Sequence, residues 1–165
     1  MELLSRADFL AILRVLEEHE VEFLVAGGVA AVLHGAPLAT FDLDLVHARS
    51  PENVSRLLAA LEALGAYFRT HPETGRAPDA SHLSSPGGQL LMTRFGPLDL
   101  LGAVGKGHGY EDLKQHCTRM DIGEGLRVQV LDLEKLIQIR EAVSAEKDRA
   151  SLPLLRRTLE EKRRA

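Results

Sequence analysis

The chain has 165 residues, of which 45% are hydrophobic and 27% are charged, and its formal net charge is -4 at pH 7. These values are typical of one globular domain, and no apolar run approaches the roughly 20 residues that cross a bilayer. They argue against a membrane protein, and the acidic charge gives no general attraction to nucleic acid.

The first predicted elements are a helix, a strand and a second helix. Ser5 and Asp8 resemble a helix start, and apolar residues then recur at helical spacing to about residue 19. Residues 21–26 form a short β-rich run that ends in Gly27 and Gly28. The apolar residues that follow predict a short buried helix after this glycine turn.

The next strand separates acidic from apolar side chains. Residues 42–46 read Asp-Leu-Asp-Leu-Val, so a period of two places Asp42 and Asp44 on one face and leucines on the other. Ser50 and Pro51 then predict the start of an amphipathic helix that Gly65 ends.

The second half of the chain predicts mainly strands and loops. Residues 70–81 indicate a surface loop, and residues 102–109 indicate a flexible glycine-rich loop that lacks the spacing of a phosphate-binding P-loop. Two strands joined by a tight turn are predicted at residues 87–95 and 98–101, with Asp99 between leucines on the second.

The remaining elements predict a helical end to the chain. A short helix at residues 111–116 precedes a hairpin of residues 119–122 and 126–130. A helical segment then begins at Asp132 and continues to the end, with Pro153 as a break. We expect residues 1–131 to form an α/β core and residues 132–165 to pack on it, as one compact domain.

Two features bear on location and partners. The single cysteine, Cys117, excludes an intramolecular disulfide, and the N-terminus lacks the pattern of a signal peptide. We therefore expect a cytoplasmic protein. An RNA partner would need a local basic patch, for which the arginines and lysine near the C-terminus are the candidate, although solvated helix ends also carry such charges.

Three features together indicate phosphoryl or nucleotidyl transfer. They are a Gly-Gly turn between a strand and a helix, the Asp-x-Asp of the next strand, and Asp99 on a later strand. Glycines let backbone N–H groups approach phosphate oxygens, and Mg²⁺ prefers carboxylate ligands. Asp-x-Asp alone is common on solvated strand faces, so the glycine turn before it carries the hypothesis. Burying several carboxylates would be costly without a cation.

The run of residues 24–30, Leu-Val-Ala-Gly-Gly-Val-Ala, and the run of residues 40–46, Thr-Phe-Asp-Leu-Asp-Leu-Val, resemble the nucleotidyltransferase superfamily. The superfamily includes DNA polymerase β and kanamycin nucleotidyltransferase, and the match looks closest to the AbiEii-type toxin branch. The resemblance implies an α/β (α+β) nucleotidyltransferase fold, in which helices flank a mixed β-sheet and a helical segment ends the chain. It also implies transfer of a nucleoside monophosphate (NMP) from a nucleoside triphosphate (NTP) to a hydroxyl group of RNA, protein or a small molecule.

The resemblance assigns roles to residues. It implies that Asp42, Asp44 and Asp99 are catalytic and ligate Mg²⁺, with two ions expected beside a bound NTP, and that Asp99 helps deprotonate the attacking hydroxyl. The nucleotide-binding residues implied are Gly27, Gly28, Thr40, Arg140 and Lys147. Arg140 and Lys147 are seven residues apart, about two helical turns, so both side chains can project toward one pocket or lie on the surface.

Two departures from the family pattern keep other functions open. Many active members have serine where this chain has Gly28, and relatives often have a basic residue where it has Leu38. The second hypothesis is therefore a weak or inactive member that acts as a binding module, such as one half of a toxin–antitoxin pair. A third is metal-dependent phosphoester hydrolysis by the same carboxylates. The acceptor is undetermined, with tRNA and a cognate protein among the candidates.

Overall fold

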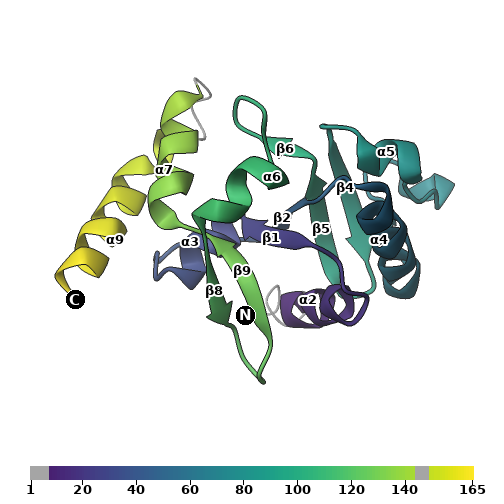
Figure 1. Ribbon diagram of the computed structural model, residues 1–165, viewed down its shortest axis with the longest axis horizontal. Helices are drawn as coiled ribbons and strands as arrows, with labels where there is room; N and C mark the ends of the chain where they lie inside the picture. Colours follow the sequence, from purple (N-terminus) through teal and green to yellow (C-terminus); the bar gives the residue numbers. More distant parts are fainter. Residues whose placement is uncertain (1–7, 144–148) are drawn as a thin grey trace.

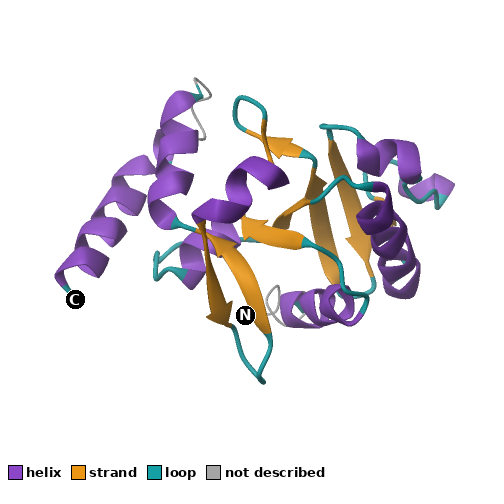
Figure 2. Cartoon of the chain, in the orientation of Figure 1, coloured by secondary structure: helices purple, strands orange, loops and turns teal. Residues whose placement is uncertain are grey.

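A computed structural model describes residues 8–143 and 149–165 of the chain. Its centre is a twisted seven-stranded sheet flanked by helices (Figures 1 and 2). In order across the sheet, the strands are β3 (Tyr67–Phe68), β4 (Gly88–Thr93), β5 (Gly96–Leu101), β2 (Leu43–His47), β1 (Phe23–Ala26), β9 (Arg127–Leu131) and β8 (Cys117–Asp121). The β2–β5 and β1–β9 pairs are parallel and the others are antiparallel. The predicted mixed α/β fold is confirmed.

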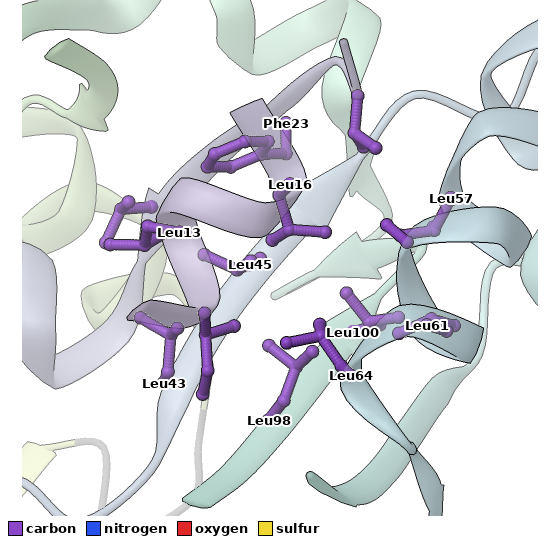
Figure 3. Packing of buried hydrophobic residues seen from close by; sticks show 14 of the residues in the cluster. Leu13, Leu16, Phe23, Leu43, Leu45, Leu57, Leu61, Leu64, Leu98 and Leu100 are labelled. Atoms are coloured by element: carbon purple, nitrogen blue, oxygen red, sulfur yellow. The ribbon is translucent and has the colours of Figure 1, made fainter. Parts of the chain in front are cut away.

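One face of the sheet is covered by α2 (Phe9–Glu18) and α4 (Pro51–Leu64), and α5 (Ala80–Ser84) packs beside α4. Leucines from α2, α4, β2 and β5 interdigitate there to form the larger hydrophobic core (Figure 3). The predicted helix ends are confirmed. Asp8 accepts a hydrogen bond from the Ala11 N–H, Ser50 accepts one from the Asn53 N–H, and Gly65 takes the left-handed conformation that ends α4.

A buried amide fixes the start of α4 to the central strands. The Asn53 side chain is fully buried, accepts a hydrogen bond from the Glu22 N–H at 2.7 Å, and donates to the carbonyls of Glu22 and Ala48. Glu22 precedes β1 and Ala48 follows β2, so this one side chain ties together the ends of both strands on which the glycine turn and Asp44 lie.

The other face of the sheet carries a second core, formed with α6 (Tyr110–Leu113) and α7 (Leu133–Ala142). The short helix α3 (Gly27–Leu33) follows β1 directly and contacts β1, β2 and α7. The last helix, α9 (Leu152–Arg164), packs on α7 and lies across the molecule from α4 (Figure 1). Its Lys162 Nζ lies 2.6 Å from Nδ1 of the buried His34, whose Nε2 lies 2.9 Å from the Leu131 carbonyl oxygen.

Several segments differ from the sequence expectation. Residues 102–109 are a small hairpin of β6 (Ala103–Val104) and β7 (His108–Gly109) instead of an unpaired loop. The expected loop at residues 70–81 holds the 3-10 helix η1 (Pro72–Thr74) and the start of α5, where Asp79 and His82 cap each other. Pro153 lies in the first turn of α9, where a missing N–H costs nothing, so it begins a helix.

The predicted short helix at residues 111–116 is divided into α6 and the 3-10 helix η2 (Lys114–His116). The predicted hairpin before the C-terminal helices is confirmed as β8 and β9. Among residues 8–143 and 149–165, no helix combines the length and the apolar character required to cross a lipid bilayer.

Candidate functional site

Two of the three singled-out carboxylates lie side by side on neighbouring strands. Asp44 of β2 pairs with Asp99 of β5 in the parallel register, and Ala26 at the end of β1 pairs with Asp44 on its other side. Residues in register on adjacent strands direct their side chains to the same face of a sheet. The alternating pattern read from the sequence therefore brings together aspartates that are far apart along the chain.

The ionisation of Asp44 is affected by burial and by its charged neighbours. Burial raises the pKa of Asp44 to about 7, and the charge of Asp99, a hydrogen bond between the two carboxyl groups and the charge of Asp42 add to this increase. The positive charge of Arg140 acts in the opposite direction. Asp99 is 9% exposed, so neither group is fully solvated. Two carboxylates that share such a site favour binding a proton or another cation between them.

The predicted glycine turn lies directly against Asp44. Gly27 has a φ of +61°, in the region that favours glycine, and a Cβ built there would overlap Asp44 Oδ2. A side chain at this position would displace the Asp44 carboxylate. Glycine is thus required here by backbone conformation and by space.

Gly28 lies against Thr40, from the loop that precedes β2. A Cβ built on Gly28 would lie 2.8 Å from Thr40 Oγ1, closer than such atoms approach. The Thr40 hydroxyl donates a weak hydrogen bond to the Asp42 carbonyl at 3.3 Å. The absence of a side chain at Gly28 therefore makes room for a hydroxyl from another segment.

Asp42 is more loosely placed than the other two aspartates. It precedes β2, its side chain is 52% exposed, and its Oδ1 lies 4.0 Å from Nη2 of Arg69. Within the described part of the chain, no three His, Cys, Asp or Glu side chains form a group that could hold a metal ion. The structure thus brings Asp44 and Asp99 together and leaves Asp42 at the edge of the pair.

Arg69 is a site residue that the sequence did not indicate. It follows β3, and its Nη1 lies 2.6 Å from Asp99 Oδ1. The same Nη1 donates a hydrogen bond to the Leu91 carbonyl oxygen at 2.9 Å. Asp99 Oδ1 itself is buried and receives no directed hydrogen bond. The positive charge of Arg69 therefore balances the negative charge of Asp99. Asp99 Oδ1 can still accept a hydrogen bond or bind a cation.

A pocket of about 160 Å³ opens beside Asp44, between the sheet and α7. Most of its lining is apolar, and the residues come from β1, β2, β5 and β9, from the start of α3, and from the β6–β7 hairpin and α7. The residues that line it are Ala26, Gly27, Asp44, Leu101, Val104, Gly105, Leu131, Leu136, Ile139, Arg140 and Val143. The structure thus places Arg140 in the same pocket as Asp44 and Gly27.

The two predicted basic residues are only partly placed. Arg140 Nη1 donates a hydrogen bond to Ser151 Oγ at 2.6 Å, which connects α7 to the start of α9. Lys147 lies outside the described residues. Arg140 lines the pocket beside Asp44, and the shared pocket for Arg140 and Lys147 stays a prediction.

The donor set fits hard cations such as Mg²⁺. The site offers carboxylate oxygens, which are the ligands that Mg²⁺ prefers, and one of them is a buried oxygen without a hydrogen-bond donor. Burial, with the neighbouring carboxylates, raises the pKa of Asp44, so a nearby cation would favour its charged form. Asp44 and Asp99 are the residues that lie together for such a cation, and Asp42 lies at the edge of the pair.

No protein-family model matches the chain, and no curated protein matches its sequence. The solution structure of the antibiotic-resistance factor ANT(2'')-Ia matches at 20% identity and a TM-score of 0.57, over 96% of this chain and 83% of that chain. Its crystal structure in complex with adenylyl-2''-tobramycin matches at 20% identity and a TM-score of 0.56, over 90% of this chain and 85% of that one.

A further match is the crystal structure of a protein from Thermotoga maritima described as a nucleotidyltransferase. It has 18% identity and a TM-score of 0.53, over 94% of this chain and 88% of that chain. At these identities the likeness shows the fold. The chain therefore has the nucleotidyltransferase fold that the two sequence motifs implied.

Proposed function

We propose that this chain transfers an NMP group from an NTP to a hydroxyl acceptor. The observation that carries the proposal is the register pairing of Asp44 with Asp99, with the Gly27 backbone packed against Asp44. In the reaction, the acceptor oxygen forms a bond to the α-phosphorus, the bond to the β-phosphate oxygen breaks, and pyrophosphate leaves. The hydroxyl proton needs an acceptor on the protein.

The paired carboxyl groups suit this proton transfer. The side chains of Asp44 and Asp99 lie on the same face of the sheet, so this pair can take up the hydroxyl proton. We assign Asp99 as the side that faces the acceptor hydroxyl and Asp44 as the side next to the phosphates, since Asp44 lies against the glycine turn.

Mg²⁺ belongs to the proposal through the same carboxylates. When bound, Mg²⁺ would neutralise the triphosphate and lower the pKa of the acceptor hydroxyl. Asp99 would supply a buried ligand and Asp44 a half-buried one, and the exposed Asp42 would join them. Two ions are expected with bound NTP, because in two-metal sites one ion serves the attacking oxygen and the other the leaving oxygen.

Thr40 and Gly28 together form the proposed phosphate contact. The position that usually carries a serine in active relatives is Gly28, and the Thr40 hydroxyl occupies the space next to it. A hydroxyl from the loop before β2 thus takes the place of a hydroxyl from the turn. Arg140 lies in the same pocket as Asp44 and would neutralise phosphate charge. Lys147 is retained as a second candidate cation from the sequence alone.

The wider biological setting is part of the same proposal. The two sequence motifs support membership of the AbiEii-type toxin branch, and with it a toxin–antitoxin pair in the cytoplasm. The packing of α7 on α9 and on α3 supports one domain in which residues 132–165 close against the core of residues 1–131.

The test is transfer of label from each NTP in turn, with label on the α-phosphate, to total tRNA or a cell lysate in the presence of Mg²⁺. Wild-type protein should give a labelled product. Asp44→Asn should abolish it, whereas Asp121→Asn should not, because Asp121 lies on the edge strand β8, far across the sheet. Label transfer that survives Asp44→Asn would refute the assigned site.

A catalytically inactive binding module is the second candidate. Arg69 forms an ion pair with Asp99, and the apolar Leu38 packs against the second core where relatives often have a basic residue. Both features favour a protein that binds a partner without chemistry. Calorimetry separates the two functions. No binding of any NTP in millimolar Mg²⁺, together with a tight protein partner in a pull-down, would favour the module. Release of phosphate or pyrophosphate without an acceptor would instead indicate hydrolysis.

A further inference from the structure

Arg69 belongs to the same row of residues as the catalytic pair. Phe68 of β3 pairs with Leu91 of β4, and the Arg69 N–H donates to the Leu90 carbonyl oxygen at 3.1 Å. Leu90 in turn pairs with Asp99, which pairs with Asp44. Register thus aligns Arg69 with both aspartates across four strands. Its side chain reaches over β4 to Asp99, so its position is set by the sheet and not by a loose loop.

The guanidinium of Arg69 occupies the position of a counter-ion to the carboxylates. Its side chain is 23% exposed, that of Asp99 is 12% exposed, and Nη1 lies 2.6 Å from Asp99 Oδ1. Nη2 lies 4.0 Å from Asp42 Oδ1, which is a weaker contact with an exposed group. One cation of the protein therefore neutralises charge on two of the three residues assigned to Mg²⁺.

The contact is built in a way that lets Asp99 be released. Asp99 Oδ1 receives charge from Arg69 without a directed hydrogen bond, while Nη1 donates to the Leu91 carbonyl oxygen. If Arg69 leaves Asp99, the guanidinium keeps this backbone acceptor and is not left buried without a partner. A bidentate arginine–carboxylate pair would be harder to separate.

We propose that Arg69 is a positioning residue that holds Asp99 in the metal-free protein and competes with divalent cations for the same carboxylate oxygens. The proposal rests on the proposed function, which assigns the metal to these aspartates. Two cations that need the same oxygens compete, so each lowers the affinity of the site for the other by the same factor. Arg69 thus stabilises the site when it is empty and lowers its affinity for metal.

The test uses the full chain and Mn²⁺ as the probe, with free Mn²⁺ measured by electron paramagnetic resonance. Arg69→Gln should bind Mn²⁺ about tenfold more tightly than wild type, within the usual range of coupling between two sites. Its midpoint of thermal unfolding should be lower than that of wild type in a chelator, and this deficit should shrink or vanish in saturating Mn²⁺. Arg94→Gln, which removes an exposed arginine from the β4–β5 turn, should change neither property.

A purely structural role for Arg69 predicts a different pattern. In that case Arg69→Gln would be destabilised equally with and without Mn²⁺, and its Mn²⁺ affinity would be unchanged or weaker; either result overturns the proposal. If Arg69→Gln does not fold, Arg69→Lys keeps the charge but lacks the planar fork, and it should bind Mn²⁺ a few times more tightly than wild type. An affinity for Mn²⁺ in Arg69→Lys no higher than in wild type would then overturn the proposal.

The outcome is separable from that of the proposed function. Label transfer by wild type with an unchanged Mn²⁺ affinity in Arg69→Gln would sink the role of Arg69 alone. Tighter Mn²⁺ binding in Arg69→Gln without label transfer to any acceptor would support competition at the carboxylates and sink the transferase activity. No Mn²⁺ binding by wild type or by either variant would overturn the competition, because there would be no site to contest.

Discussion

The two faces of strands β2 and β5 carry opposite chemistry. On one face, Leu43, Leu45, Leu98 and Leu100 are fully buried under α2 and α4. On the other face, one residue away along each strand, Asp44 and Asp99 meet beside a pocket. A slip of one residue in the register would bury the aspartates in the core and expose the leucines. The apolar face therefore fixes the register that brings the carboxylates together.

One face of these strands thus stabilises the fold, and the other face of the same strands carries the candidate site. Substitutions at neighbouring positions of one strand should therefore change either stability or activity, and both can be measured. The predictions that follow test it from the largest expected effect to the smallest.

Asp44→Asn should have the largest effect, and the effect should be on activity. We expect transfer to fall by about 10³-fold or more, a loss of roughly 4 kcal/mol in transition-state stabilisation, because a proton acceptor and a proposed metal ligand are removed together. The free energy of unfolding should stay the same or rise at neutral pH, since a neutral amide does not repel Asp99. Initial rates and urea unfolding of the purified variant measure both quantities. A large loss of stability would contradict the division by face.

Leu45→Ala, one position further along β2, should show the opposite pattern. Removing this fully buried side chain should lower the free energy of unfolding by about 3 kcal/mol, through lost burial and the cavity left behind. The fraction of protein that remains folded should transfer NMP at nearly the wild-type rate. Leu90→Ala is the matched control, because Leu90 is 38% exposed and should cost less than about 1 kcal/mol. An equal loss of unfolding free energy in the two variants would contradict the burial of Leu45 in the core.

The division by face also explains what the sequence could predict. Alternation of aspartate and leucine in residues 42–46 and 98–101 predicted two strands with one acidic face, and the register confirms that Asp44 and Asp99 share it. The helix ends at Asp8, Ser50 and Gly65 follow from local backbone chemistry, so they could be predicted too. Each of these patterns depends only on residues that are close together in the sequence.

What the sequence did not predict depends on pairing between distant segments. Arg69 follows a strand of only two residues, and its proximity to Asp99 results from the registers of β3 with β4 and of β4 with β5. The contact between Gly28 and Thr40 likewise joins a helix start to a loop. Neither contact can be predicted from a local pattern of residue types. The hairpin of β6 and β7 was missed because strands of two residues are too short to show alternation.

Gly28→Ala should have an intermediate effect whose sign depends on Thr40. In the wild-type background the added methyl group lies 2.8 Å from Thr40 Oγ1, and we expect the free energy of unfolding to fall by about 1 kcal/mol. In a Thr40→Gly background the same substitution should stabilise the protein by up to about 1 kcal/mol, because alanine favours the helix α3 more than glycine does. Urea unfolding of all four proteins completes the cycle.

Gly87→Ala is the matched control for this cycle, since its Cβ would meet only ordinary contacts at 3.5 Å or more. It should change stability little in either background. An equal cost for Gly28→Ala with and without Thr40 would mean that the two residues do not contact each other, and the proposed replacement of a turn serine by Thr40 would lose its basis.

The last prediction concerns the pH dependence of stability, where two residues of β2 should act in opposite directions. Burial and the neighbouring carboxylates raise the pKa of Asp44 to about 7, so between pH 4 and 7 the folded protein binds more protons here than the unfolded chain. The contribution of Asp44 to stability should therefore be full in acid and be lost as the pH rises through 7. Burial lowers the pKa of His47 below its ordinary value of 6.5, so its contribution is full above pH 6.5 and is lost as the pH falls.

The contribution of each residue can be measured by comparison with a variant that cannot titrate at that position. The measured quantity is the free energy of unfolding of wild type minus that of the variant. The free energy of unfolding of wild type minus that of Asp44→Asn, measured without metal from pH 4.5 to 8, should fall with pH by at most about 1.4 kcal/mol per unit. The same difference for His47→Gln should rise with pH up to about 6.5, because a neutral His47 keeps its 2.8 Å contact with the Leu83 carbonyl in the core. Burial disfavours the charged form of both groups, and because Asp44 is an acid and His47 a base, the two slopes should have opposite signs. A difference that rises with pH for Asp44, or falls with pH for His47, would contradict the burial of that group.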